Sequence, residues 1–163
     1  MPISDYISRI RAKIGNDLLI LTGTSAVIIN HSNEVLLQLR SDLDIWTLLG
    51  GYLDPGEDLA DGIIREVREE AGITVVPERI VAVLSGRDHF HTYDNGHQVA
   101  IINICFRCQP LDDRAPQPND DESVDVRYFP PDQLPDNTFP WHRTLIEKAL
   151  GDKVTAYFRP PSI

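Results

Sequence analysis

Three glutamates that lie close together in the sequence have the clearest capacity for chemistry. Glu66, Glu69 and Glu70 stand at positions i, i+3 and i+4, a spacing that places their carboxylates on one face of a helix. Like charges at this spacing repel by roughly a few tenths of a kcal/mol, and Arg65 and Arg68 offset part of that repulsion. Carboxylate oxygens are also the ligands that Mg²⁺ and Mn²⁺ prefer. Two interpretations are therefore open, a solvated charged surface and a site for divalent cations.

Apolar residues at helical spacing accompany these glutamates and predict the helix that positions them. They are Leu59, Ala60, Ile63, Ile64, Val67 and Ala71. Gly72 stands where a glycine commonly ends a helix, and Asp54-Pro55-Gly56 predicts a turn before the helix begins. The glutamates are thus predicted on a different face from the apolar stripe.

The whole segment resembles the signature of the Nudix hydrolases, the MutT-like family. The signature is Gly, five residues, Glu, seven residues, then Arg-Glu-apolar-x-Glu-Glu-x-Gly-apolar. The matching positions are Gly51, Glu57, Arg65, Glu66, Val67, Glu69, Glu70, Gly72 and Ile73. The resemblance implies an α/β/α sandwich with a mixed β-sheet, and the order of expected elements agrees with that fold. We expect one Nudix domain over residues 1–163, with an N-terminal helix and lead-in at 1–17 and the box loop and helix at 50–73.

The resemblance also implies metal-dependent hydrolysis of a nucleoside diphosphate linked to another group. It suggests Glu66, Glu69 and Glu70 as ligands of Mg²⁺ or Mn²⁺, and the carbonyl of Gly50 as a backbone ligand. Glu57 would bind a further metal or hold Arg65, which would orient the carboxylates. The catalytic base stays open among Glu122, Glu69 and a metal-bound hydroxide. Asp121 is a second candidate for the acidic residue that joins the site from outside the box.

Three further residues are candidates for contacting the substrate. Arg40, at the end of an expected strand, could bind phosphate, although a surface arginine is an equal alternative. Arg87 and Tyr93 flank a segment of mixed aromatic and polar residues that suits a base or a sugar, and its alternative is an ordinary solvent-exposed hairpin. ADP-ribose, a dinucleoside polyphosphate, a nucleotide sugar and a damaged nucleoside triphosphate remain open as substrates.

The rest of the chain predicts strands, a hairpin and two more helices. An amphipathic helix carrying Tyr6, Ile7, Ile10 and Ile14, capped by Ser4 or Asp5, would pack on the domain, with a homodimer contact or a lid as alternatives. Asn95-Gly96 predicts a tight hairpin, and a closing helix from Trp141 to Leu150 would bury Trp141. The segments 24–30 and 34–40 are expected to form a hairpin. The other expected strands are 18–21, 73–76, 80–84, 99–108 and 124–129. The tail at 154–158 would add an edge strand or stay loose.

Composition limits the function classes. A net charge of −10 argues against a nucleic-acid partner, and no apolar run is long enough for a membrane span. The N-terminus lacks the form of a signal peptide, so we expect a cytoplasmic protein. Cys105 and Cys108 would point to opposite faces of one strand as free thiols. The alternatives to the hydrolase are a nucleotide-sensing module without catalysis and a prenyl-diphosphate isomerase, which needs a reactive cysteine in its pocket.

Overall fold

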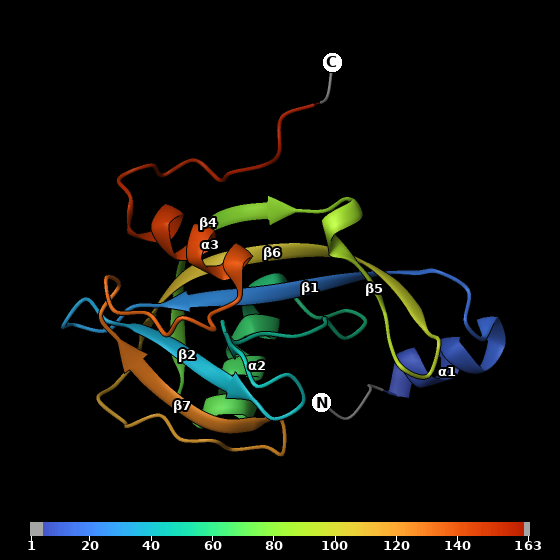
Figure 1. Cartoon of the computed structure of the whole chain (residues 1–163), viewed down its shortest axis with the longest axis horizontal. Coiled ribbons are helices and arrows are strands. Elements are labelled where there is room, and N and C mark those ends of the chain that lie inside the picture. The colour runs from blue at the N-terminus through green and yellow to red at the C-terminus, as the bar shows by residue number, and fades with distance from the viewer. Residues whose placement is uncertain (1–4, 162–163) are drawn as a thin grey trace.

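The computed structural model describes residues 5–161, so Ser4, one of the two expected caps of the first helix, lies outside the described residues. Figure 1 shows the helices and strands of the chain. They are α1 (Asp5–Ile14), β1 (Leu19–Ile28), β2 (Val35–Arg40), β3 (Trp46–Thr47), α2 (Leu59–Ala71), β4 (Val75–Leu84), η1 (Arg87–His89), β5 (Phe90–Thr92), β6 (Gln98–Pro110), β7 (Ser123–Phe129) and α3 (Pro140–Leu150). None of the helices in this part of the chain is long and apolar enough to cross a membrane.

The strands form two sheets, and the larger one is mixed. In it β6 lies between β1, which runs parallel to it, and β4, which runs antiparallel, while β5 also pairs with β6. The smaller sheet has the order β3-β2-β7 and is antiparallel. The predicted mixed sheet is therefore confirmed.

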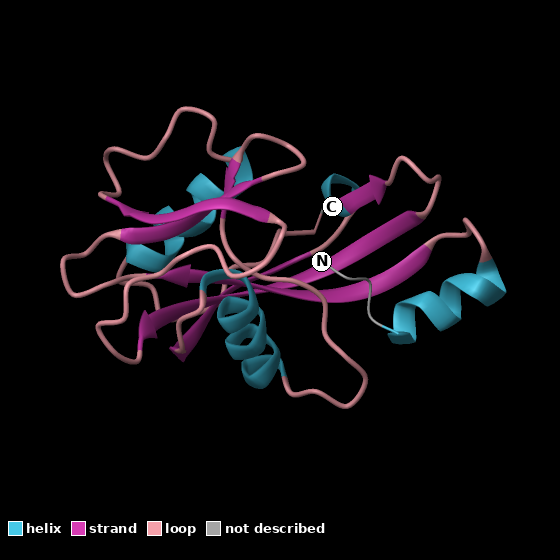
Figure 2. Cartoon of the chain, turned by 90° about the horizontal axis from the view of Figure 1, so that it is seen from below, coloured by secondary structure: helices cyan, strands magenta, loops and turns pink. Residues whose placement is uncertain are grey.

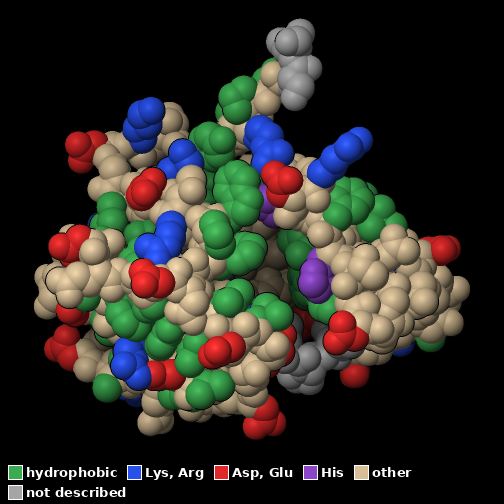
Figure 3. All heavy atoms as spheres, viewed as in Figure 1, with side chains coloured by type: hydrophobic (Ala, Val, Ile, Leu, Met, Phe, Trp, Pro, Cys, Tyr) green, Lys and Arg blue, Asp and Glu red, His purple; other side chains and the backbone are tan. Residues whose placement is uncertain are grey.

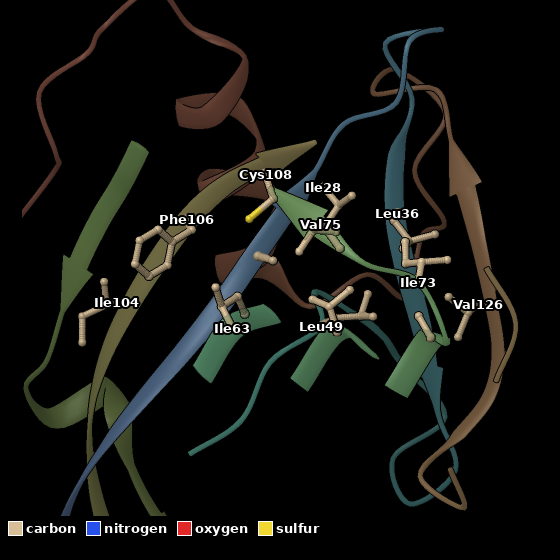
Figure 4. Close-up of a cluster of buried hydrophobic side chains, with 13 residues drawn as sticks. Ile28, Leu36, Leu49, Ile63, Ile73, Val75, Ile104, Phe106, Cys108 and Val126 are labelled. Carbon is tan, nitrogen blue, oxygen red and sulfur yellow. The ribbon is translucent and has the colours of Figure 1, made fainter. Parts of the chain in front are cut away.

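Alternate residues of β1 and β6 face different helices, which makes the fold a three-layer sandwich. Ala26 and Ile28 of β1 pack with Ile63 and Val67 of α2 in one buried cluster (Figure 4). The intervening Val27 packs with residues of α3 in a second cluster. Figure 2 shows the strands with α2 on one side and α3 on the other. The predicted α/β/α sandwich is confirmed, since side chains of an extended strand alternate between its faces.

Several strand predictions were wrong in detail. The segments 18–21 and 24–30 form one continuous strand, β1, in which Gly23 is an interior residue. The predicted hairpin with β2 reduces to a single bridge between Ile29 and Val35, after which the two strands enter different sheets. Similarly β4 continues through Pro77, which has no N–H to donate, and the register shifts between Pro77 and Arg79. The Asn95-Gly96 turn does join β5 to β6, with Gly96 at a φ of 83°.

Helix α1 packs on its own domain through one apolar and one charged residue. Ile7 is buried against Leu21 of β1 and Val99 of β6. Arg11 is 7% exposed, and its guanidinium donates hydrogen bonds to three carbonyls, the nearest being Gln98 at 2.6 Å and Asp17 at 2.7 Å. These contacts tie α1 to the edge of the large sheet. The homodimer alternative stays a prediction.

The C-terminal segment completes the layer around α3. Leu145, Ile146 and Ala149 are buried as predicted. Trp141 is only partly buried, because it lies at the start of α3, where its ring is 6.2 Å from that of His89 in η1. Tyr157 then pairs with the edge of β4, donating from its N–H to Val81 and accepting from the N–H of Val83. The tail therefore adds to the sheet edge rather than staying loose.

The two cysteines give a first prediction, because they are buried on opposite faces of β6. Cys105 lies in the cluster beside α3 and Cys108 in the cluster beside α2, and both are free thiols. Burial raises the pKa of the Cys105 thiol to about 12 and also raises the pKa of Cys108. We expect neither thiol to react with an aromatic disulfide reagent at pH 8 until denaturant is added. A stoichiometric reaction of the native protein would contradict this and would favour the isomerase alternative.

Candidate active site

Helix α2 carries the predicted acidic residues and has a capping hydrogen bond at its C-terminal end. It follows Asp58 and ends at Gly72, whose φ of 68° is left-handed and whose N–H donates to the carbonyl of Arg68. Glu66 and Glu70 are each 2% exposed, whereas the side chain of Glu69 is 53% exposed. The three glutamates therefore share a helix but not an environment: two carboxylates face the protein and one faces solvent.

Arg65 is the cation that holds the acidic residues of the box. Its guanidinium makes a two-pronged contact with Glu57, with Nε to Oε1 at 2.7 Å and Nη2 to Oε2 at 2.8 Å. Its Nη1 donates to one oxygen of Glu66 at 2.8 Å and one oxygen of Glu69 at 3.2 Å. Hydrogen bonds from Arg65 lower the pKa of Glu57. Of the two roles expected for Glu57, the structure displays the contact with Arg65.

Glu70 is held by neutral groups instead. Its Oε1 accepts from Nε2 of Gln38 at 3.0 Å, and its Oε2 accepts from the N–H of Gly50 at 2.8 Å. Gln38 is fixed in turn by Ser123, whose hydroxyl donates to Oε1 of Gln38 at 2.6 Å. Burial raises the pKa of Glu70 to about 8, and these hydrogen bonds offset only part of the effect. Glu70 is thus a carboxylate positioned by hydrogen bonds in a site with little solvent.

Gly50 can make this contact only because it is glycine. Its φ of 146° lies in the region that other residues rarely adopt. A Cβ at this position would also lie 2.1 Å from the carbonyl oxygen of Thr24. The box loop therefore lies flush against β1 and aims the N–H of Gly50 at Glu70.

A second acidic segment completes a group of carboxylates. Glu70, Asp120 and Glu122 each offer an oxygen, and these atoms lie within 4.8 Å of one another. Asn119 ties the segment to α2, because its N–H donates to the carbonyl of Glu70 and its side chain donates to the carbonyls of Arg68 and Glu69. The end of α2, which has carbonyls without helical partners, therefore positions the loop.

The grouping differs from the expected set of three helix glutamates. Among the described residues, only Glu70 of the three belongs to the group of close carboxylates, and Glu66 and Glu69 instead both contact Arg65. Asp121, the second candidate for the extra acid, is exposed and outside the group. Glu122, the first candidate, lies within it. Coordination by Glu66 and Glu69 stays a prediction.

Sequence reasoning missed Gln38, Ser123 and Asp120. Gln38 is a polar residue, 2% exposed, inside the apolar strand β2, and that contrast could have identified it. Asp120 accepts hydrogen bonds from the N–H groups of Glu122 and Ser123, the local turn typical of aspartate. The acidic run at 120–122 was the available signal, but it does not single out Asp120, because the run bends before β7 begins.

The three residues expected to contact the substrate, Arg40, Tyr93 and Arg87, have different surroundings in the structure. Arg40 makes a two-pronged ion pair with Asp42, with distances of 2.7 and 2.8 Å, which raises its pKa, and the nearby Glu70 and Tyr93 raise it further. Tyr93 shares a hydrogen bond of 2.9 Å with the hydroxyl of Tyr52 in the box loop. Arg87 is exposed at the start of η1. Arg40 and Tyr93 thus lie near the site, while Arg87 as a substrate contact stays a prediction.

Fold and site together define the class of Nudix hydrolases. The protein-family model described as the NUDIX domain matches residues 20–149 of this chain, a range that includes the box, β2 and the acidic segment. The chain belongs to the Nudix family. This match covers the order of elements as well as the box itself, so it extends the resemblance beyond the motif.

Individual relatives share the family but differ in the substrates that their names give. The RNA pyrophosphohydrolase of Zymomonas mobilis is 28% identical over 146 residues, which cover 80% of this chain and 92% of that protein. A Bacillus subtilis protein provisionally named an ADP-ribose pyrophosphatase is 28% identical over 105 residues, 64% of this chain and 48% of that protein. The chain therefore spans about half the length of this Bacillus relative.

Solved structures agree with the fold. The crystal structure of an ADP-ribose pyrophosphatase from Streptococcus suis matches with a TM-score of 0.63 at 27% identity, covering 83% of this chain and 96% of that one. A MutT protein from Methanosarcina mazei matches with a TM-score of 0.66 at 25% identity, covering 82% and 94% of the two chains.

The buried carboxylates predict how the stability of the metal-free protein depends on pH. The pKa of Glu70 rises from 4.5 to about 8, and burial raises the pKa of Glu66 to about 7. In this interval the folded state binds more protons than the unfolded state, so the free energy of unfolding should fall as pH rises. His142, whose pKa burial lowers to about 4, acts oppositely only below 6.5. We therefore expect the melting temperature in chelator to fall between about pH 6.5 and pH 8.

Substitution tests the origin of this slope. Glu70→Gln should flatten it, whereas Glu78→Gln, on the exposed side of β4, should keep it. A wild-type slope in Glu70→Gln would mean that other groups govern the stability in this range.

Proposed function

We propose that the chain hydrolyses the pyrophosphate linkage of a nucleoside diphosphate joined to another group, with Mg²⁺ or Mn²⁺ bound by its acidic residues. Water attacks one phosphorus, the P–O–P bond breaks, and two phosphate-bearing products leave. The observation that carries this proposal is the group of Glu70, Asp120 and Glu122 beside the Arg65 cluster. Residues 1–163 would act as one catalytic domain.

The residues present fit a divalent cation. Their donors are carboxylate oxygens within 4.8 Å of one another, the ligand type of Mg²⁺ and Mn²⁺. Burial also penalises the charge of Glu66 and Glu70, a penalty that a cation relieves. Bound there, a divalent cation would neutralise the charge of the phosphates, orient them and activate water.

The proposed ligands are Glu66, Glu69 and Glu70 with the carbonyl of Gly50, and Glu122 and Asp120 extend this set. Arg65 contacts only one oxygen of Glu66 and one of Glu69. A carboxylate has two oxygens, so each keeps one for coordination while Arg65 fixes its orientation. Glu57 neutralises Arg65 and aligns its fork, a role that does not require Glu57 to contact a metal.

The base that accepts the proton of the attacking water is proposed to be Glu122 or Glu69. Glu122 lies beside Glu70 in the acidic group, which places a carboxylate next to the proposed cation site. Glu69 is the more exposed of the helix glutamates and so is open to incoming water. Variants separate the two, because loss of the base changes turnover more than metal affinity.

Arg40 is the proposed contact for a substrate phosphate whose negative charge the cation does not neutralise. It lies close enough to Glu70 and to Tyr93 for both to raise its pKa. Its partner Asp42 is exposed and can yield to a phosphate. Arg87, which is exposed at the start of η1, is a further proposed substrate contact. The names of two relatives, an ADP-ribose pyrophosphatase and an RNA pyrophosphohydrolase, both give a pyrophosphate linkage in a nucleotide compound, which is the class proposed for this chain.

Carboxamide substitutions test the site. We expect Glu69→Gln, Glu70→Gln and Glu122→Gln each to lower kcat by about a hundredfold or more while the far-ultraviolet circular dichroism is unchanged, because each removes a charge from the cation site or the base. Glu78→Gln, matched in chemistry but on β4, should keep wild-type turnover. Full activity of the Glu70 variant with Mg²⁺ would overturn the proposed site.

A screen with nucleoside triphosphates, ADP-ribose, nucleotide sugars and dinucleoside polyphosphates, with Mg²⁺ and with Mn²⁺, tests the reaction itself. Release of a nucleoside monophosphate is the expected product from ADP-ribose or a nucleotide sugar. Tight binding without metal-dependent turnover of any member would favour the sensing module instead.

A further inference from the structure

The face of the molecule seen in Figure 3 is hollowed near its centre, between the part that carries α3 and the part that carries β5. Strands β1 and β6 run across this region (Figure 1). They present here the face that is opposite to α2, because Val27 and Cys105 on that face pack with α3. The hollow is therefore separate from the acidic group, which includes Glu70 of α2.

The floor of the hollow differs from the rest of this sheet face. At one end Leu21 and Val99 form an apolar cluster with α1, and at the other end Val27 and Cys105 form one with α3. Between them the same face carries Gly23, Ser25 and Asn103. Three small or polar residues thus interrupt an apolar surface on two neighbouring strands, where a buried polar side chain without a partner is costly.

Asn103 has hydrogen-bonding capacity that its local contact does not use. Its Nδ2 donates to the hydroxyl of Ser25 at 3.0 Å, and this is its one side-chain hydrogen bond within residues 5–161. A carboxamide can donate two hydrogen bonds and accept two. The anchor to Ser25 therefore fixes the orientation of the side chain and leaves a donor and an acceptor for a ligand.

Aromatic side chains link the elements around the hollow. The hydroxyls of Tyr52 and Tyr93 join the box loop to the β5–β6 hairpin, and His91 packs edge-on against Tyr93 with ring centroids 4.5 Å apart. His89 and Trp141 join η1 to α3. Flat rings around a floor with one oriented carboxamide suit a planar heterocycle, which stacks on aromatic side chains and is recognised along its polar edge.

The box loop connects this hollow to the proposed cation site. Tyr52 forms an antiparallel β-bridge with Gly23 on the floor of the hollow. Only one residue separates Tyr52 from Gly50, whose N–H donates to Glu70. We propose that the hollow binds the nucleobase of the substrate and that Asn103 is the residue that determines base specificity by pairing with the donor and acceptor of one base edge. This inference rests on the proposed function for its choice of ligand, but binding of a nucleotide needs neither metal nor turnover.

Affinities for AMP, GMP and ribose 5-phosphate, measured by calorimetry in chelator, test the proposal. The wild-type protein should bind AMP at least about tenfold more tightly than ribose 5-phosphate, which lacks the base. Asn103→Ala should remove most of this difference and leave the affinity for ribose 5-phosphate unchanged. Asn103→Asp offers two acceptors, which match the two donors of guanine, and should shift the ratio of GMP to AMP affinity by about tenfold to a hundredfold in favour of GMP.

Controls separate specificity from damage to the fold. Gln109→Glu, at the exposed end of the same strand, should keep wild-type affinities for all three ligands. If Asn103→Asp does not fold, Asn103→Ser provides the same test as the alanine variant, with loss of AMP binding alone expected. Equal wild-type affinities for AMP and ribose 5-phosphate, or a wild-type GMP-to-AMP ratio in Asn103→Asp, would overturn the inference. Base selectivity without hydrolysis of any nucleotide would instead overturn the proposed hydrolysis and leave the inference about Asn103 standing.

Discussion

The contact of one guanidinium with three carboxylates is the interaction on which the box depends. Arg65 joins Glu57 from the loop to Glu66 and Glu69 from α2, and it also donates to the carbonyl of Tyr52. Without it, α2 would hold like charges at helical spacing and the loop would lose its tie to the helix. Because Arg65 takes a single oxygen from each helix glutamate, it reduces repulsion and fixes geometry without using up the capacity of these carboxylates to bind a cation.

Glu70 represents the opposite arrangement, a carboxylate with no cationic partner. Gln38 and the N–H of Gly50 orient it, but neutral donors do not cancel a buried negative charge. The resulting rise in its pKa is a measure of that cost. At the proposed site, a divalent cation would therefore gain more from Glu70 than from Glu69, which is exposed and already paired with Arg65. The site therefore combines Glu70, whose buried carboxylate forms no ion pair with a cationic side chain among the described residues, with Glu66 and Glu69, which both contact Arg65.

Features set by local spacing could be predicted from the sequence, and features set by long-range contacts could not. The helix, its Gly72 cap, the partnership of Glu57 with Arg65 and the nearness of Glu122 follow from spacing or from the family pattern. Gln38 meets Glu70 across 32 positions, and Ser123 meets Gln38 across 85. The periodicity of apolar residues along the sequence does not predict contacts between side chains so far apart in the chain. The wrong β1–β2 hairpin has the same cause, since both strands have turn residues between them but find better partners in different sheets.

The alternation of side chains along β1 would let one short segment serve both the proposed cation site and the proposed base site. Ala26 supports α2 and its glutamates, while Ser25, on the other face, anchors Asn103. The box loop runs along the free edge of β1, where Leu49 and Gly51 accept hydrogen bonds from Ala26 and Thr24. A nucleotide with its phosphates at α2 and its base in the hollow must therefore cross this edge. Glycine at position 50 keeps the loop thin at the crossing, because a Cβ there would collide with the strand itself.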